Sequence, residues 1–141
     1  MFKTILVALD ASQQADIVVQ TLDAIELQAA TKVILAHVIP PSEVGGEWAA
    51  DRPHNPAEEI PYIHLEKQLQ AYQVNLPCAS QIEIVSGDVA AEIVRLANIH
   101  AADLIVIGSR GLTGLNRILQ GSVSGQVVEE APCSVLVVKQ K

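Results

Sequence analysis

The stretch 103–111, DLIVIGSRG, carries four consecutive apolar residues that run directly into glycines and polar residues. A continuous apolar run rich in β-branched residues is typical of a strand buried on both faces of a parallel sheet. Runs of the same kind occupy residues 5–9, 33–38 and 135–138, and a weaker one occupies residues 82–85. The sequence therefore predicts five strands, the fourth of which ends in a glycine loop.

Helical patterns lie between the predicted strands, because apolar side chains recur there at spacings of about three and four residues. The residues concerned are Val18, Leu22, Ile25, Ala29, Tyr62, Leu65, Leu69, Tyr72, Ile93, Leu96 and His100. Helix starts are expected at Ser12, Asp88 and Ser122, and Pro132 is expected to end the last helix. The alternation predicts the α/β class: a three-layer, doubly wound, five-stranded parallel sheet with right-handed crossovers.

Length and composition predict one compact domain over residues 1–141. The apolar fraction of 50% argues against disorder, and the apolar runs are far shorter than the ~20 residues that a bilayer requires. No cleavage site follows the first strand, so a cytoplasmic location is expected. The irregular stretch at about residues 40–56 is expected to form a flexible lid or an ordinary surface loop.

The formal charge of −7 argues against nucleic-acid binding, because the nine Lys and Arg residues form no basic cluster. Cys78 and Cys133 form neither a C-x-x-C pair nor a metal-ligand spacing, so we expect two reduced, partly buried thiols. The histidines show no ligand spacing, and His37 is expected in the core or at an edge. The sequence thus predicts no metal site.

Polar residues and glycines follow the first and fourth predicted strands, at Asp10 and from Gly108 onward. Ligands of doubly wound sheets bind beyond the carboxyl ends of the strands, where the strand order reverses, so these residues are expected to face one another. Glycines let the backbone approach a ligand, and a helix starting after Gly121 would attract an anion with its first amides. Phosphate is the expected occupant, although such a loop also serves as a turn without any ligand.

Two common phosphate motifs are absent, namely G-x-x-x-x-G-K-[ST] anywhere and G-x-G-x-x-G in the first turn after a strand. Arg110 is expected either to reach the anion or to face solvent. A hydrolase needs a group that positions water and a firm metal ligand, and Asp10 is the one carboxylate expected within reach. No catalytic residue is therefore predicted.

The pattern G-x-x-G-(nine residues)-G-[ST] is formed by Gly108, Gly111, Gly121 and Ser122. With this pattern the chain resembles the ATP-binding branch of the universal stress protein family. The likeness spans the whole chain, with matching segments at residues 3–12, 36–39, 103–108 and 133–138. One departure is Ser134, where members of the family often have proline; it affects the entry to the last strand and leaves the pocket untouched.

The resemblance implies an adenine nucleotide alpha hydrolase-like sheet with strand order 3-2-1-4-5. It also implies that ATP or another adenine nucleotide is the ligand, with Asp10 and the backbone around Ala8 at the base or ribose, Val38 at the adenine and Gly108 at the ribose. The residues implied around the phosphates are Ser109, Arg110, Gly111, Gly121, Ser122, Val123 and Ser124. Mg²⁺ bridging the phosphates is a further expectation.

The family resemblance also implies a homodimer in which the last strand, Val135 to Val138, pairs with its counterpart. The function implied is that of a stress-response signalling module that binds ATP, ADP or AMP. Two alternatives stay open: a slow ATPase or phosphotransferase, and a dimeric partner protein that works without a nucleotide.

Overall fold

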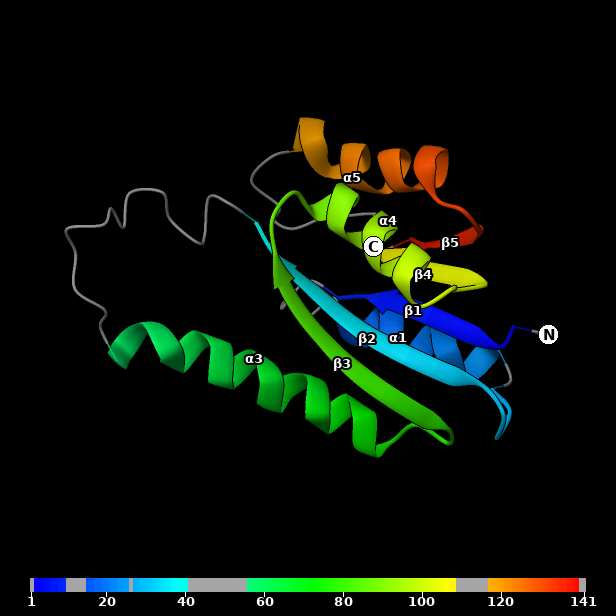
Figure 1. The fold of residues 1–141 in the computed structure, drawn as a ribbon, viewed down its shortest axis with the longest axis horizontal. Coiled ribbons are helices and arrows are strands. Elements are labelled where there is room, and N and C mark those ends of the chain that lie inside the picture. The colour runs from blue at the N-terminus through cyan, green and yellow to red at the C-terminus, as the bar shows by residue number, and fades with distance from the viewer. Residues whose placement is uncertain (1, 10–14, 26, 41–55, 109–116, 140–141) are drawn as a thin grey trace.

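The computed structural model describes residues 2–9, 15–25, 27–40, 56–108 and 117–139, and these form one sheet with helices on both sides (Figure 1). The strands are β1 (Thr4–Ala8), β2 (Lys32–Ile39), β3 (Ala79–Ser86), β4 (Leu104–Gly108) and β5 (Ser134–Val138). All neighbouring strands pair in parallel, in the order β3-β2-β1-β4-β5. The predicted fold class and the strand order 3-2-1-4-5 are therefore confirmed.

The helices make the two outer layers of the fold. They are α1 (Ala15–Ala24), α3 (Pro56–Val74), α4 (Val89–Ile99) and α5 (Arg117–Glu130). In Figure 1, α1 and α3 cover one face of the sheet, and α4 and α5 cover the other. This division follows from the strand order, because the crossovers through α1 and α3 run toward the β3 edge and those through α4 and α5 run toward the β5 edge.

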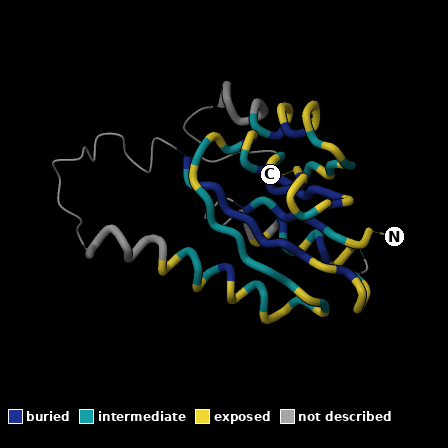
Figure 2. Tube along the Cα trace, in the orientation of Figure 1, coloured by how far each residue is buried: buried dark blue, intermediate teal, exposed yellow. Residues whose placement is uncertain are grey.

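The core consists of two apolar layers separated by the sheet, because side chains on each strand alternate between its faces. Ile5 and Val7 point into the layer beneath α1 and α3, whereas Leu6 points into the layer beneath α4 and α5. The same alternation holds in β2 and β4, whose apolar residues are almost completely buried. Figure 2 shows this as a buried centre with the exposed residues on the outer surfaces of the helices. The continuous apolar runs in the sequence therefore correspond to strands that are covered on both faces, as predicted.

Three predicted boundaries differ from the observed ones. The first helix ends at Ala24 rather than near Ala29, since its last turn tightens into a bond of 3.1 Å from the Ile25 N–H to the Leu22 carbonyl. The third strand is longer than residues 82–85, because an edge strand with half-exposed polar residues lacks a continuous apolar run. The last helix starts at Arg117 rather than at Ser122, because residues 117–120 (RILQ) are compatible with a helix and contain no turn-forming residue.

At the amino end of the sheet, Asp103, which lies just before β4, binds the start of β1 through hydrogen bonds. Its Oδ2 accepts hydrogen bonds from the backbone N–H groups of Lys3 at 2.7 Å and Thr4 at 3.0 Å. Its own N–H donates to the Thr4 carbonyl at 2.8 Å. The two backbone donors favour the charged carboxylate and lower the pKa of Asp103. One side chain thus fixes where β1 begins relative to β4.

Helix α4 is capped at both ends. Asp88 is the N-cap, as predicted, and its carboxylate accepts from the Ala91 N–H at 3.0 Å. At the other end, the N–H of Ala102 donates to the Ala97 carbonyl, and Ala101 has a φ of 53°. This is a Schellman motif whose left-handed position holds alanine where glycine is preferred.

Replacing Ala101 by glycine should stabilise the protein by about 1 kcal/mol, because glycine adopts a positive φ without steric cost. Ala91, an exposed residue within the same helix, is the matched control: Ala91→Gly should destabilise by about 0.5–1 kcal/mol. Urea unfolding of both variants measures the two changes. Equal destabilisation by both substitutions would contradict the capping account.

Replacing Asp103 by asparagine should lower the stability at pH 7 and lower it less in acid. Because the pKa of Asp103 is lowered in the folded protein, its contribution is complete above the ordinary value of 3.8 and is lost as the pH falls through the lower folded value. Urea midpoints of the two proteins, measured from pH 7 downward, should therefore converge in acid. A difference that stays constant over this range would refute the charge-assisted contacts.

Candidate functional site

The candidate site lies at the carboxyl edge of the sheet, where the strand order reverses. β1 and β4 are neighbours, yet the chain leaves β1 toward β2 on one side and leaves β4 toward β5 on the other. After these two strands the chain enters helices on opposite faces of the sheet, and ligands of this architecture bind in the crevice beyond the carboxyl ends between them. The structure brings Ala8, at the end of β1, and Gly108, at the end of β4, to this point.

Val38 belongs to the same edge because β2 extends beyond the end of β1. The last pair between these strands is Ala8 with Ala36, and the Leu9 N–H adds one bond of 2.8 Å to the Ala36 carbonyl. Backbone groups alternate in direction along a strand, so Val38 turns its N–H and carbonyl toward β1, as Ala36 does. Ile39 faces the other way, and its carbonyl accepts from the Gly87 N–H at 3.0 Å.

The carbonyl of Leu9 is bonded to a side chain. His37, only 4% exposed, places Nδ1 2.8 Å from the Leu9 oxygen. A carbonyl can only accept, so Nδ1 carries the proton and donates. Among the described residues, no hydrogen bond joins the Leu9 carbonyl to the Val38 N–H. The Val38 backbone therefore faces the edge with both a donor and an acceptor.

The predicted ligand residues fall into three groups. Ala8 and Gly108 are half-buried and Val38 is buried at the carboxyl edge. Asp10, Ser109, Arg110 and Gly111 lie outside the described residues, as does the predicted lid apart from Pro40 and Pro56. The remaining four belong to α5: Gly121, Ser122, Val123 and Ser124.

The position of these four residues in α5 corrects one expectation. Because the helix begins at Arg117, Gly121 and Ser122 lie inside it, and its unpaired first amides belong to the preceding turn. Val123 is half-buried against the core, and Ser124 is 7% exposed. A phosphate at Gly121 would thus meet the side of the helix instead of its amino end.

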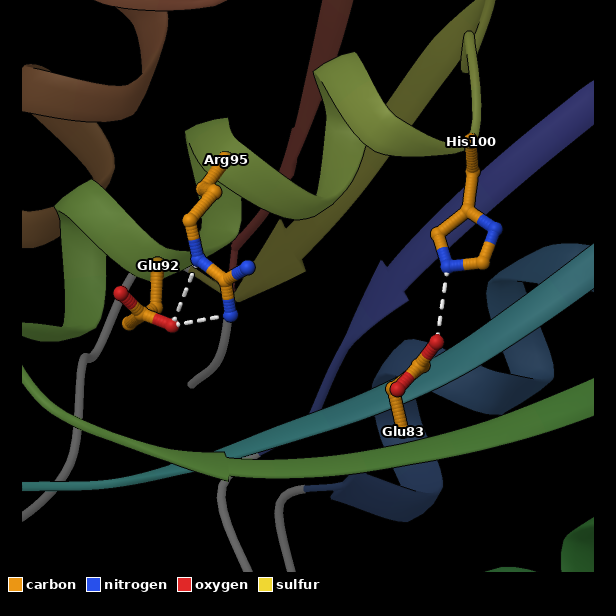
Figure 3. A network of polar contacts seen from close by, with 4 residues as sticks. All are labelled: Glu83, Glu92, Arg95 and His100. Atoms are coloured by element: carbon orange, nitrogen blue, oxygen red, sulfur yellow. Dashed lines mark hydrogen bonds and ion pairs between the residues drawn. The ribbon is translucent and has the colours of Figure 1, made fainter.

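Two of the histidines considered from the sequence lie away from this edge. His64 is exposed on α3. His100 ends α4, and its Nε2 lies 2.9 Å from Oε2 of Glu83 on β3 (Figure 3). Nearby, Arg95 donates to Oε1 of Glu92 from Nε and Nη2, at 3.0 Å and 2.7 Å. The His100–Glu83 contact joins α4 to the edge strand, whereas the Arg95–Glu92 pair lies within α4.

The two cysteines are unpaired and half-buried, as predicted. Cys78 and Cys133 precede β3 and β5, so both lie at the amino end of the sheet, away from the candidate site. Burial raises the pKa of both thiols, and the carboxylate of Asp103 raises the pKa of Cys133 further.

In the part of the chain that is described, no group of three or more His, Cys, Asp or Glu residues could hold a metal ion. Within the same residues, no helix is long and apolar enough to cross a membrane.

The strand order and the helices on both faces define an open, doubly wound parallel α/β fold. Within that class, the family model "Universal stress protein family" matches residues 1–139. The chain belongs to the universal stress protein family.

The relatives include two proteins of Methanocaldococcus jannaschii. Universal stress protein MJ0577 is 31% identical over 161 aligned positions, covering 100% of this chain and 97% of the relative. Universal stress protein MJ0531 is 53% identical over 58 residues, which is 41% of this chain and 34% of that protein. The solved structure of MJ0577 superposes with a TM-score of 0.83, covering 100% of this chain and 98% of that one.

Two other solved structures contain nucleotides. A universal stress protein in complex with cAMP has a TM-score of 0.67 and 23% identity, and covers 97% of this chain and 96% of that chain. The universal stress protein of Archaeoglobus fulgidus in complex with dAMP has a TM-score of 0.66 and 21% identity, with coverages of 97% and 98%. At these identities the likeness establishes the shared fold.

Proposed function

We propose that the protein binds an adenine nucleotide at the carboxyl edge of β1, β2 and β4. The observation that carries this proposal is the Val38 backbone, which turns a donor and an acceptor toward the gap beyond the end of β1. The edge of adenine presents the complementary pair, since N1 accepts a hydrogen bond and the N6 amino group donates one. The buried apolar side chains around Val38 suit the flat faces of the base.

Relatives of the same fold support the class of ligand. The ligands of these two complexes, cAMP and dAMP, each carry an adenine base, one sugar and one phosphate. This chain shares the fold over nearly its whole length, and the glycine pattern from Gly108 to Ser122 adds a place for phosphates. We therefore infer that ATP, ADP, AMP or a cyclic adenine nucleotide is the ligand.

The phosphates would lie between the loop after β4 and the side of α5. Glycines at residues 108, 111 and 121 carry no Cβ, so phosphate oxygens can approach the backbone there. Ser109, Arg110, Ser122 and Ser124 would supply further donors, and Asp10 would meet the base or ribose. Mg²⁺ would arrive with the polyphosphate and neutralise part of its charge.

The carboxyl edge of the sheet supports nucleotide binding best as the activity of this protein. The nucleotide-bound protein would then carry the signal. The Val38 backbone and the glycines bind and orient a nucleotide, and neither supplies a proton-transfer group. Action in a cytoplasmic stress response and a single domain over residues 1–141 stay predictions from the sequence.

Calorimetric titration of the full chain with ATP, ADP, AMP and cAMP, with and without Mg²⁺, tests the proposal. Gly121→Val should weaken ATP binding by about tenfold or more, because the added side chain occupies the space of a phosphate. Gly125→Val is the matched control: Gly125 lies one turn later in α5, where an added Cβ meets nothing within 4 Å. This variant should bind ATP like the unmodified protein.

Absence of heat for all four nucleotides would refute nucleotide binding. Equal loss of affinity in the two glycine variants would refute the phosphate position. Multiple-turnover phosphate release that disappears in Asp10→Ala would identify a slow ATPase instead of a binding module.

We further propose that the protein forms a homodimer through β5. This edge strand lacks charged residues and leaves Leu136 37% exposed, and Val128 on the adjacent α5 is 53% exposed. The opposite edge strand, β3, carries Glu83 in its middle, and a charged residue at that position discourages pairing. A two-fold axis would therefore join the β5 edges of two copies.

Light scattering should give a mass about twice the 15.0 kDa of one chain. Leu136→Lys should shift the protein to monomer, because pairing would bury a charge. Val74→Lys is the control, since Val74 is 82% exposed on α3, away from β5. A monomeric mass for the unmodified protein, or an unchanged dimer in Leu136→Lys, would refute this interface.

A further inference from the structure

His37 is the polar residue within the apolar run of β2, and it directly precedes Val38. We propose that His37 is a positioning residue: by holding the Leu9 carbonyl, it keeps the Val38 N–H available to read the N1 edge of a purine. This inference deepens the proposed function and rests on it, because the purine is the base of the proposed nucleotide.

The contact is firm because the ring is buried. His37 lies on the same face of β2 as Val33 and Leu35 and is 4% exposed. At this depth the Nδ1 proton has the Leu9 oxygen as its partner, at 2.8 Å. A buried donor that loses its acceptor is left with the full cost of desolvation, so the side chain holds the carbonyl where it is.

The same carbonyl has a second possible donor in the sheet. The ladder between β1 and β2 ends with the Leu9 N–H on the Ala36 carbonyl, and the next bond of a parallel ladder would join the Val38 N–H to the Leu9 carbonyl. Among the described residues that bond is absent. His37 donates to this carbonyl from the side and holds its direction, and the ladder stops one bond early.

Because the β1–β2 hydrogen-bond ladder ends before Val38, the Val38 backbone determines which purine base this edge of the sheet can bind. A Val38 N–H that is not bonded to the Leu9 carbonyl can donate to N1 of adenine, which carries no proton. Hypoxanthine carries a proton at N1 and an oxygen at C6, so it would set donor against donor and acceptor against acceptor. Discrimination between ATP and ITP therefore reports on the Val38 backbone, whereas binding of tripolyphosphate reports only on the phosphate region.

The experiment compares ATP, ITP and tripolyphosphate binding to the full chain and to three variants. His37→Leu removes the donor and should weaken ATP binding by about five- to tenfold, with little change for ITP or tripolyphosphate. His37→Asn should restore ATP binding, because its amide nitrogen occupies the place of Nδ1. His37→Gln, whose amide nitrogen reaches the place of Nε2, should not restore it.

An unchanged ratio of ATP to ITP affinity in His37→Leu would overturn the inference, as would equal behaviour of the Asn and Gln variants. The comparison of Asn with Gln also covers the case in which His37→Leu does not fold. A loss of affinity shared by all three ligands would mean that His37 merely supports the fold, which also contradicts the inference.

Two measurements without nucleotide separate this inference from the proposed function. Nitrogen-15 spectra of the free protein should show His37 protonated at Nδ1. Hydrogen exchange at the Val38 amide should be slower in His37→Leu than in the unmodified protein, because the Leu9 carbonyl then becomes available to it. A bare Nδ1 or equal exchange would overturn the role of His37, whereas failure of ATP binding with both results as expected would overturn only the nucleotide.

Discussion

The pairing of β1 with β2 on one side and β4 on the other determines the rest of this structure. Ile5, Leu6 and Val7 are at most 1% exposed, and burial of each side chain contributes about 1.5–3 kcal/mol. Because β1 is the central strand, its end defines the floor of the candidate site. The connections after β1 and β4 lead to helices on opposite faces of the sheet, so the strand order reverses at this point.

The sequence predicted the fold well because strands buried on both faces appear in a sequence as continuous apolar runs. The short apolar runs of β1, β2 and β4 are rich in β-branched residues, which is typical of covered strands, and their alternation with helical patterns indicated a parallel sheet. β3 was underestimated because an edge strand is half-exposed and mixes Gln81 and Glu83 with apolar residues. The start of α5 was misplaced because Gly121 and Ser122 are common at helix starts, while the preceding residues gave no competing signal.

For the candidate site, the residues after the first and fourth strands predicted the edge, and the family resemblance implied Ala8 and Val38. The structure places these two residues and Gly108 at that edge, and their contact with a ligand stays a prediction. The sequence could not predict the contact of His37 with Leu9, because that contact depends on the register of β1 against β2. The available signal was a lone histidine within an apolar strand, which is compatible with many buried environments. Spacing along one chain does not report which backbone group across the sheet a side chain will meet.

At the two ends of the sheet, side chains make hydrogen bonds of opposite direction to the backbone. At the amino end, Asp103 accepts from two backbone amides and thereby satisfies donors that the ladder leaves over. At the carboxyl end, His37 donates to a backbone carbonyl and thereby leaves a neighbouring amide without that acceptor. The first arrangement stabilises a strand start, and the second leaves the Val38 backbone donor that a planar ligand would use in our proposal.

The difference between the outer strands has a consequence for growth of the assembly. A sheet with two apolar edges can add copies at both sides without limit, which is how fibres begin. Here Glu83 lies in the middle of β3 and contacts His100, whereas β5 has no charged residue. In the proposed dimer, the uncharged β5 edge of each copy would be buried against the other copy. Only the β3 edges would stay exposed, and the charge of Glu83 there would prevent further chains from adding.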